Sequence, residues 1–128
     1  MYKIQEWANL IRSYEGWREG KIVNGKRIGG SLTWRLNNPG ALRYSPFQDG
    51  TKGGFSYFET ERKGMDALKY QLGIAVSGRS KVYRPTDTLL EFQRKYSPSS
   101  DGNDPIKYCK FIADGLGVNI NTQIKDLA

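Results

Sequence analysis

The chain has 128 residues, one cysteine, no histidine and a formal net charge of +7, and its length predicts a single domain over residues 1–128. Without histidine it cannot form Ser–His or Cys–His catalytic pairs or most zinc sites, and one cysteine cannot form an internal disulfide. We therefore expect carboxylates, amides, hydroxyls and aromatic rings to carry any chemistry, with neither a metal nor a cofactor.

The first predicted helix covers residues 4–14, where apolar residues recur at intervals of three and four, and Gly16 suits its end. The following stretch, residues 17–54, is rich in glycine and predicts turns and short extended pieces. Pro39 and Gly40 suit the two central positions of a type II turn. Residues 55–58 alternate as in a short strand, so a small turn-rich β insertion is predicted after the first helix.

Helices dominate the second half of the predicted structure. One starts near Thr60 and ends near Gly78, with apolar residues at helical spacing. The next starts at Thr88, which forms a capping box with Glu91, and it ends before Pro98. These signals predict an α+β chain that is mostly α.

A further helix is predicted to start at Pro105 after the cap residue Asp104 and to end before Gly117. Cys109 lies on its apolar face, which indicates a small buried residue rather than a nucleophile. A short helix from about Thr122 completes the chain.

The positive charge favours an anionic partner, either a nucleic acid or an anionic polymer such as a bacterial cell wall. Scattered rather than clustered basic residues argue against a nucleic acid. No apolar run approaches the roughly 20 residues of a membrane span, and the polar segment 1–6 predicts no signal peptide. We expect a monomer, made in the cytoplasm, that binds neither nucleic acid nor membrane.

Glu15 closes the first predicted helix and is the candidate general acid. Protonating a glycosidic oxygen requires a carboxyl whose pKa is raised. The negative helix end disfavours the ionised form only slightly, so burial against Tyr14, Trp17 or Trp34 must supply the rest. The alternative is an ordinary surface glutamate at a helix end.

The amides of Asn37 and Asn38 can face a sugar's N-acetyl or hydroxyl groups, or they can satisfy the backbone of their own turn. Trp34, Tyr44 and Tyr57 can stack on sugar rings or fill the core. In the polar loop 96–103, Asp101 and Asn103 can line a cleft or act as turn formers.

In this order, these segments resemble a lysozyme-like family found in bacteriophage particles, endolysins and prophage regions. The matching segments are residues 14–17, 31–44, 55–58, 83–85, 88–89, 96–103 with Tyr108, and 116–118. The resemblance implies a lysozyme-like α+β fold, with peptidoglycan cleaved between N-acetylmuramic acid and N-acetylglucosamine at the cell wall, by a free enzyme or as part of a virion.

By the same resemblance, Glu15 matches the catalytic glutamate. The predicted substrate-binding residues are Trp34, Asn37, Asn38, Tyr44, Tyr57, Asp101, Asn103 and Tyr108. The family's turn usually has a third asparagine where this chain has Leu36, and often one where it has Ala41. These two departures bear on the details of substrate contact.

The sequence does not identify a second catalytic carboxylate to work with Glu15. An inverting hydrolase needs a partner carboxylate about 6.5–9.5 Å from the acid and a retaining one about 5–5.5 Å, with Asp49, Glu59 and Asp101 as candidates. A lytic transglycosylase, as in goose-lysozyme-like families, needs only the single glutamate. The alternatives to an enzyme are a virion structural or wall-binding protein without turnover and, more remotely, a nucleic-acid-binding domain.

Overall fold

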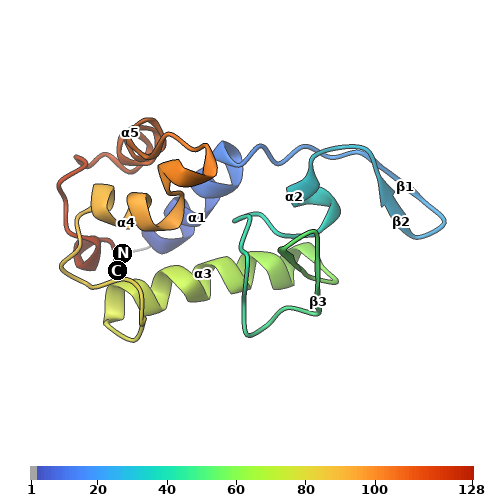
Figure 1. Ribbon diagram of the computed structural model, residues 1–128, viewed down its shortest axis with the longest axis horizontal. Coiled ribbons are helices and arrows are strands. Elements are labelled where there is room, and N and C mark those ends of the chain that lie inside the picture. Colours follow the sequence, from blue (N-terminus) through green and yellow to red (C-terminus); the bar gives the residue numbers. More distant parts are fainter. Residues whose placement is uncertain (1–2) are drawn as a thin grey trace. The chain divides into compact units, whose positions relative to one another are not determined.

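The computed structural model describes residues 3–128, and Figure 1 shows its helices and strands. In chain order they are α1 (Lys3–Tyr14), β1 (Lys21–Val23), β2 (Lys26–Ile28), α2 (Leu32–Arg35), β3 (Gly50–Lys52), β4 (Phe55–Tyr57), α3 (Glu61–Ser77), α4 (Leu89–Tyr96), η1 (Ser99–Asp101), α5 (Pro105–Leu116) and η2 (Ile124–Leu127). The α+β class, mostly α with a small β insertion after the first helix, is confirmed.

Contacts divide the chain into two compact units, one formed by the N-terminal residues up to Leu10 with Gln71–Ala128, and the other by Ile11–Tyr70. The single lysozyme-like domain stays a prediction. Within residues 3–128, no helix combines the length and the apolar character that a membrane crossing requires. Residues 1 and 2 of the polar N-terminal segment lie outside the described part.

The helix ends of the first unit follow from local sequence, as predicted. Thr88 Oγ1 accepts a hydrogen bond from Glu91 N at 3.1 Å, and the Glu91 carboxylate accepts one from Thr88 N at 2.9 Å, so the capping box forms. Asp104 caps α5 by accepting from Lys107 N at 3.1 Å. Gly117 ends α5 with φ +70°, a conformation that suits glycine. The predicted C-terminal helix is the short 3₁₀ turn η2.

The core of the first unit is built on aromatic rings. The Trp7 and Phe92 ring centroids lie 4.8 Å apart, and Tyr83 contacts Phe92 at 4.5 Å. Helices α4 and α5 of this unit pack against each other (Figure 1). Cys109 is fully buried on α5, and this burial raises the pKa of its thiol to about 11. The thiol therefore stays protonated at neutral pH, as expected of a packing residue.

An ion pair holds the loop before α4. Asp87 is 8% exposed, and its Oδ2 accepts from Lys95 Nζ at 2.7 Å and from Arg84 N at 3.0 Å. Burial acts to raise the pKa of Asp87, but the hydrogen bonds from Lys95 and Arg84 bring it below its ordinary value. The Asp87 carbonyl also accepts from Ile124 N, which fixes the C-terminal segment.

We expect Asp87→Asn to lower the free energy of unfolding at neutral pH by about 1–2 kcal/mol, because Lys95 is partly exposed and solvent screens the pair. A carboxylate with a lowered pKa stabilises the fold above its unfolded pKa of about 3.9 and loses that effect as pH falls through its folded pKa. Urea titrations between pH 7 and pH 2 should show this acid loss in the wild type and a smaller loss in the variant. If the free energy of unfolding falls by the same amount with pH in the wild type and the variant, this prediction is wrong.

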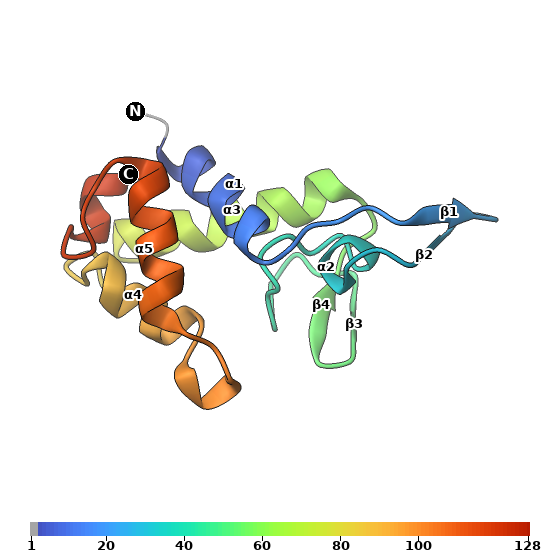
Figure 2. The ribbon, with the colours of Figure 1, turned by 90° about the horizontal axis from the view of Figure 1, so that it is seen from above.

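The second unit contains two hairpins and the short helix α2. In the first hairpin, Ile22 of β1 pairs with Arg27 of β2, and the connecting residues Asn24 and Gly25 have φ of +52° and +76°. Positive φ at both central positions is typical of a type I′ turn. Figure 2 shows this hairpin extending away from α2, whereas β3 and β4 lie beside α2.

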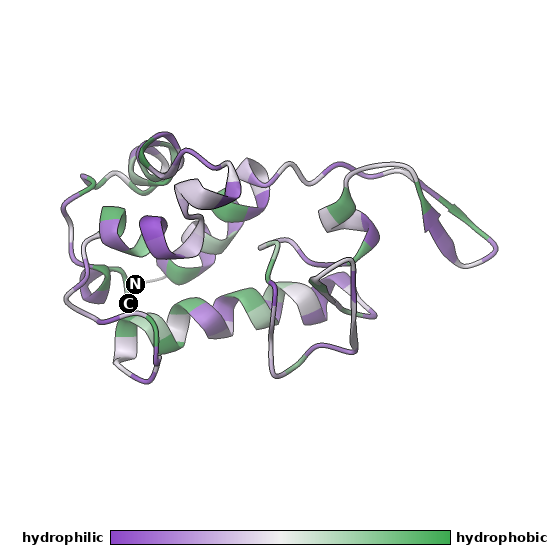
Figure 3. Ribbon diagram, viewed as in Figure 1, coloured by the Kyte–Doolittle hydropathy of each residue, from purple (hydrophilic) through white to green (hydrophobic). Residues whose placement is uncertain are grey.

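The predicted turn and the third helix meet in this unit. Ala41 N donates to Asn38 O at 3.1 Å, which closes a turn around Pro39 and Gly40 as predicted. The predicted type II geometry is wrong, because Gly40 lacks the positive φ that the third residue of a type II turn requires. Helix α3 is amphipathic, and Figure 3 shows hydrophobic and hydrophilic segments alternating along it. A Cβ at Gly64 of α3 would overlap the Asn37 carbonyl oxygen, so the glycine allows helix and turn to touch.

Candidate functional site

Glu15 occupies the first position after α1. Its N–H donates to Ile11 O at 2.9 Å, as in a continuing helix, and Gly16 then ends the turn with φ +81°. The Glu15 side chain is half-buried and lines a cavity of about 170 Å³. The other lining residues are Leu32, Thr33, Leu36, Asn38, Ala41 and Phe55. Among the described residues that line it, Glu15 alone is ionisable, and apolar surroundings favour the neutral form of a carboxyl.

The aromatic residues expected around Glu15 do not line this cavity. Trp17 lines a different cavity of about 310 Å³, and its ring carries the Arg12 guanidinium at 4.6 Å. Trp34 is 2% exposed, with the Arg27 guanidinium 4.6 Å from its ring. The cavity that Glu15 lines has Phe55 as its one aromatic residue among those described, beside aliphatic residues and the polar Thr33 and Asn38.

Both departures from the resembling family lie at this cavity. Leu36 replaces an amide with an apolar side chain in the lining. Ala41 also lines it and has φ +50°, a left-handed conformation that asparagine tolerates better than alanine. Leu36 and Ala41 therefore both add apolar surface to the cavity that Glu15 lines.

Asn38 holds the turn against β4. It is 1% exposed, and its Nδ2 donates to Leu42 O at 2.9 Å and to Ser56 O at 3.0 Å. Its Oδ1 accepts from Leu42 N at 2.9 Å. Although Asn38 lines the Glu15 cavity, its amide is engaged within the protein, in keeping with the alternative that the turn satisfies itself.

Asn37 differs from its neighbour. It is 4% exposed with φ +53°, and its Nδ2 donates to Phe58 O at 2.9 Å. Its Oδ1 is buried with no hydrogen-bond donor in the structure. A buried carbonyl oxygen without a donor is rare and calls for an explanation.

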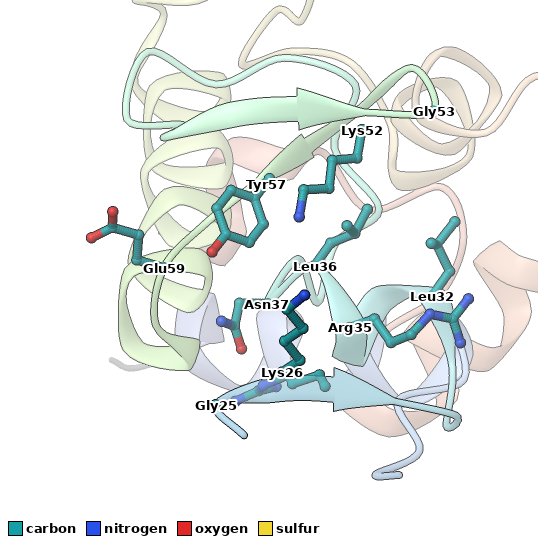
Figure 4. A pocket seen from close by; sticks show the side chains of 11 residues that line it. Gly25, Lys26, Leu32, Arg35, Leu36, Asn37, Lys52, Gly53, Tyr57 and Glu59 are labelled. Carbon is teal, nitrogen blue, oxygen red and sulfur yellow. The ribbon is translucent and has the colours of Figure 1, made fainter. Parts of the chain in front are cut away.

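Asn37 and Tyr57 line a second, larger cavity of about 610 Å³, shown in Figure 4. Its walls come from the two hairpins, α2 and the residues that follow α2. The other lining residues are Gly25, Lys26, Arg27, Leu32, Arg35, Leu36, Lys52, Gly53 and Glu59. Leu32 and Leu36 line both this cavity and the Glu15 cavity, so the two are neighbours.

The remaining predicted substrate-binding residues lie elsewhere. Tyr44 is 69% exposed and lines neither cavity. Asp101, Asn103 and Tyr108 belong to the other unit. Asp101 is exposed on η1, Asn103 donates to Pro98 O at 3.3 Å, and Tyr108 is 2% exposed with its ring edge-on to Tyr96. The buried rings of Trp34 and Tyr108 offer no open face for a sugar.

The candidate second carboxylates do not line the Glu15 cavity. Asp49 forms an ion pair with Lys63 and accepts from Glu59 N at 2.9 Å. The hydrogen bonds from Lys63 and Glu59 N hold the pKa of Asp49 below its ordinary value. Glu59 is one of the residues that line the larger cavity.

Comparisons with known proteins find no counterpart: no family model, no curated protein and no solved structure matches the chain. The assignment of function therefore depends on the two neighbouring cavities and on the resemblance carried by the sequence segments. Within residues 3–128, no group of three or more acidic or cysteine side chains is arranged to hold a metal ion.

The sequence interpretation missed the cationic residues of the larger cavity. Lys26 and Lys52 each adjoin a two-residue hairpin turn, Asn24–Gly25 and Gly53–Gly54. The dipeptide Asn-Gly between residues of alternating polarity is a strong hairpin signal, so the first turn was available in the sequence. The approach of one hairpin to the other depends on tertiary packing and had no local signal.

Proposed function

We propose that this protein is a glycosidase that degrades peptidoglycan, cleaving between N-acetylmuramic acid and N-acetylglucosamine with Glu15 as the general acid. The observation that carries the proposal is a half-buried carboxyl at the end of α1 that lines an apolar cavity. The resemblance of residues 14–17 and 31–44 to a lysozyme-like family supports the same assignment. The site of action is the cell wall, reached by a free enzyme made in the cytoplasm or by a virion.

The chemistry follows from the state of the Glu15 carboxyl. The neutral form of this carboxyl can donate a proton to the glycosidic oxygen as the C–O bond breaks. The leaving sugar departs as an alcohol, and Glu15 is left as a carboxylate. In that form it can accept a proton in the second half of the reaction.

Of the two mechanisms, the cavity favours the lytic transglycosylase. Among the described residues that line it, no second carboxylate accompanies Glu15 to activate water. The substrate's own N-acetyl oxygen can bond to the anomeric carbon as the leaving oxygen is protonated. The muramic 6-hydroxyl then displaces it, forms a 1,6-anhydro ring and returns its proton to the Glu15 carboxylate.

Mass spectrometry of muropeptides released from purified cell walls tests the proposal. We expect products that end in 1,6-anhydromuramic acid, and equal release with or without EDTA because the mechanism needs no metal. Products with reducing ends would replace the transglycosylase with a hydrolase. Wall binding without any released product would instead identify a structural or wall-binding protein that lacks turnover.

A further inference from the structure

The larger cavity has features that the reaction at Glu15 does not use. It lies within residues 11–70, and its volume of about 610 Å³ is in the range of small-ligand sites, about 300–1,000 Å³. Four of its lining residues are cationic and one is acidic. Such a lining attracts an anion.

Two of the four cationic side chains already form hydrogen bonds or an ion pair within the protein. Arg27 Nη1 donates to Trp34 O at 2.7 Å, and its Nη2 lies 3.4 Å from the Glu61 carboxylate. Arg35 Nη1 donates to Gly29 O at 3.0 Å and to Gly30 O at 2.9 Å. These contacts fix the two guanidinium groups as part of the wall.

The other two cations are available to a ligand. Figure 4 shows the ammonium ends of Lys26 and Lys52 pointing toward one another, while the Glu59 carboxylate points away from them. Within residues 3–128, the Lys26 and Lys52 side chains make no hydrogen bond or ion pair, and the Lys52 Nζ lies 4.4 Å from the centroid of the Tyr57 ring. Two like charges facing each other across a cavity are relieved by an anion between them.

Asn37 indicates a second feature that the ligand of this cavity should have. Its buried Oδ1 lacks a donor, and Figure 4 shows its amide between Tyr57 and Lys26. A ligand N–H or O–H in the cavity would supply the donor that this oxygen lacks. The complementary ligand therefore carries an anionic group and, close to it, a hydrogen-bond donor.

We propose that this cavity binds a free carboxylate of the acidic peptide stems of peptidoglycan. A stem peptide presents carboxylates next to amide N–H groups, which matches the two ammonium groups and the Asn37 oxygen together. A phosphodiester of a wall polymer supplies only acceptors through its phosphate. The shared residues Leu32 and Leu36 place the cavity beside Glu15, so a glycan strand cleaved there would carry its peptide into it. The wall as the source of the peptide rests on the proposed function.

The test measures peptide binding by calorimetry, which needs no turnover. The probes are a synthetic stem tetrapeptide with free carboxylates, the same peptide with its carboxylates amidated, and inorganic phosphate. We expect the wild type to prefer the free-carboxylate peptide over both other probes. Lys26→Gln/Lys52→Gln should weaken that binding by about tenfold or more, the effect of losing one charge-assisted hydrogen bond.

A matched control, Lys21→Gln/Lys110→Gln, makes the same change in net charge at exposed residues that line neither cavity, and it should bind the peptide like the wild type. Any of three results would overturn the proposal. The wild type could bind the free and amidated peptides equally, both double variants could lose the same affinity for the peptide, or phosphate could bind more tightly than the peptide. If the protein prefers the free-carboxylate peptide but releases no muropeptides, the proposed peptide site is supported and the proposed glycosidase activity is contradicted. The two assignments therefore fail separately.

Discussion

Replacing Glu15 with glutamine is expected to lower the rate of wall lysis by about 10²–10⁴-fold, the usual contribution of general acid catalysis. The amide keeps the shape of the side chain and removes the proton that the leaving oxygen requires. The free energy of unfolding should stay within about 0.5 kcal/mol of wild type or rise, because a neutral amide tolerates the apolar cavity at least as well as a carboxyl.

The measurement is a turbidity assay on purified walls beside a melting curve for the same preparation. Glu6→Gln is the matched control, since Glu6 is an exposed glutamate on the same helix. It should lyse walls at the wild-type rate. A Glu15→Gln protein that also lyses at that rate, or one that loses stability while its folded fraction stays active, would assign Glu15 a structural role.

The second large effect concerns Gly64. Gly64→Ala should destabilise the fold by about 2–3 kcal/mol or more, because the added Cβ overlaps the backbone oxygen of Asn37 and lies 3.1 Å from Pro39 Cδ. The helix and the turn must then separate, which moves the segment that carries Asn37 and Asn38. Lysis should fall with stability for the same reason.

Gly73 provides an internal control in the same helix α3. A Cβ there meets nothing within 4 Å, so Gly73→Ala should stabilise the protein by about 0.5–1 kcal/mol through helix propensity. Urea unfolding of both variants gives the comparison directly. Similar small changes in both would show that the turn can shift without cost and that Gly64 has no special role.

The helix ends could be predicted from the sequence because capping hydrogen bonds join residues that are close together in the chain. Thr88 and Glu91 are three residues apart, as are Asp104 and Lys107, and these pairs form the expected hydrogen bonds. The short helix α2 was missed since four residues give too little periodicity to detect. Its Ser31 cap, which accepts from Trp34 N at 3.3 Å, was the one local sign.

The site was only partly predictable. The position of Glu15 at a helix end follows from the pattern of α1 and Gly16, but its neighbours Leu32 and Phe55 are distant in sequence. The same holds for Asn38, whose amide reaches Ser56, and for the meeting of two hairpin lysines across one cavity. Such long-range contacts are set by the packing of the whole unit, and no periodic pattern in the sequence indicates them.

The turn Asn24–Gly25 at the tip of the first hairpin has a consequence for chemical ageing. Asn24 is exposed, and a Cβ placed on Gly25 would meet no residue other than its chain neighbours within 4 Å, so the turn lies in open space. An unhindered Asn-Gly bond is the kind that deamidates on storage, when the glycine nitrogen attacks the side-chain amide and ammonia leaves. Water then opens the resulting succinimide ring, which leaves a carboxylate beside Lys26, at the rim of the larger cavity. An old preparation would thus carry an added negative charge beside the site that we propose for an anion.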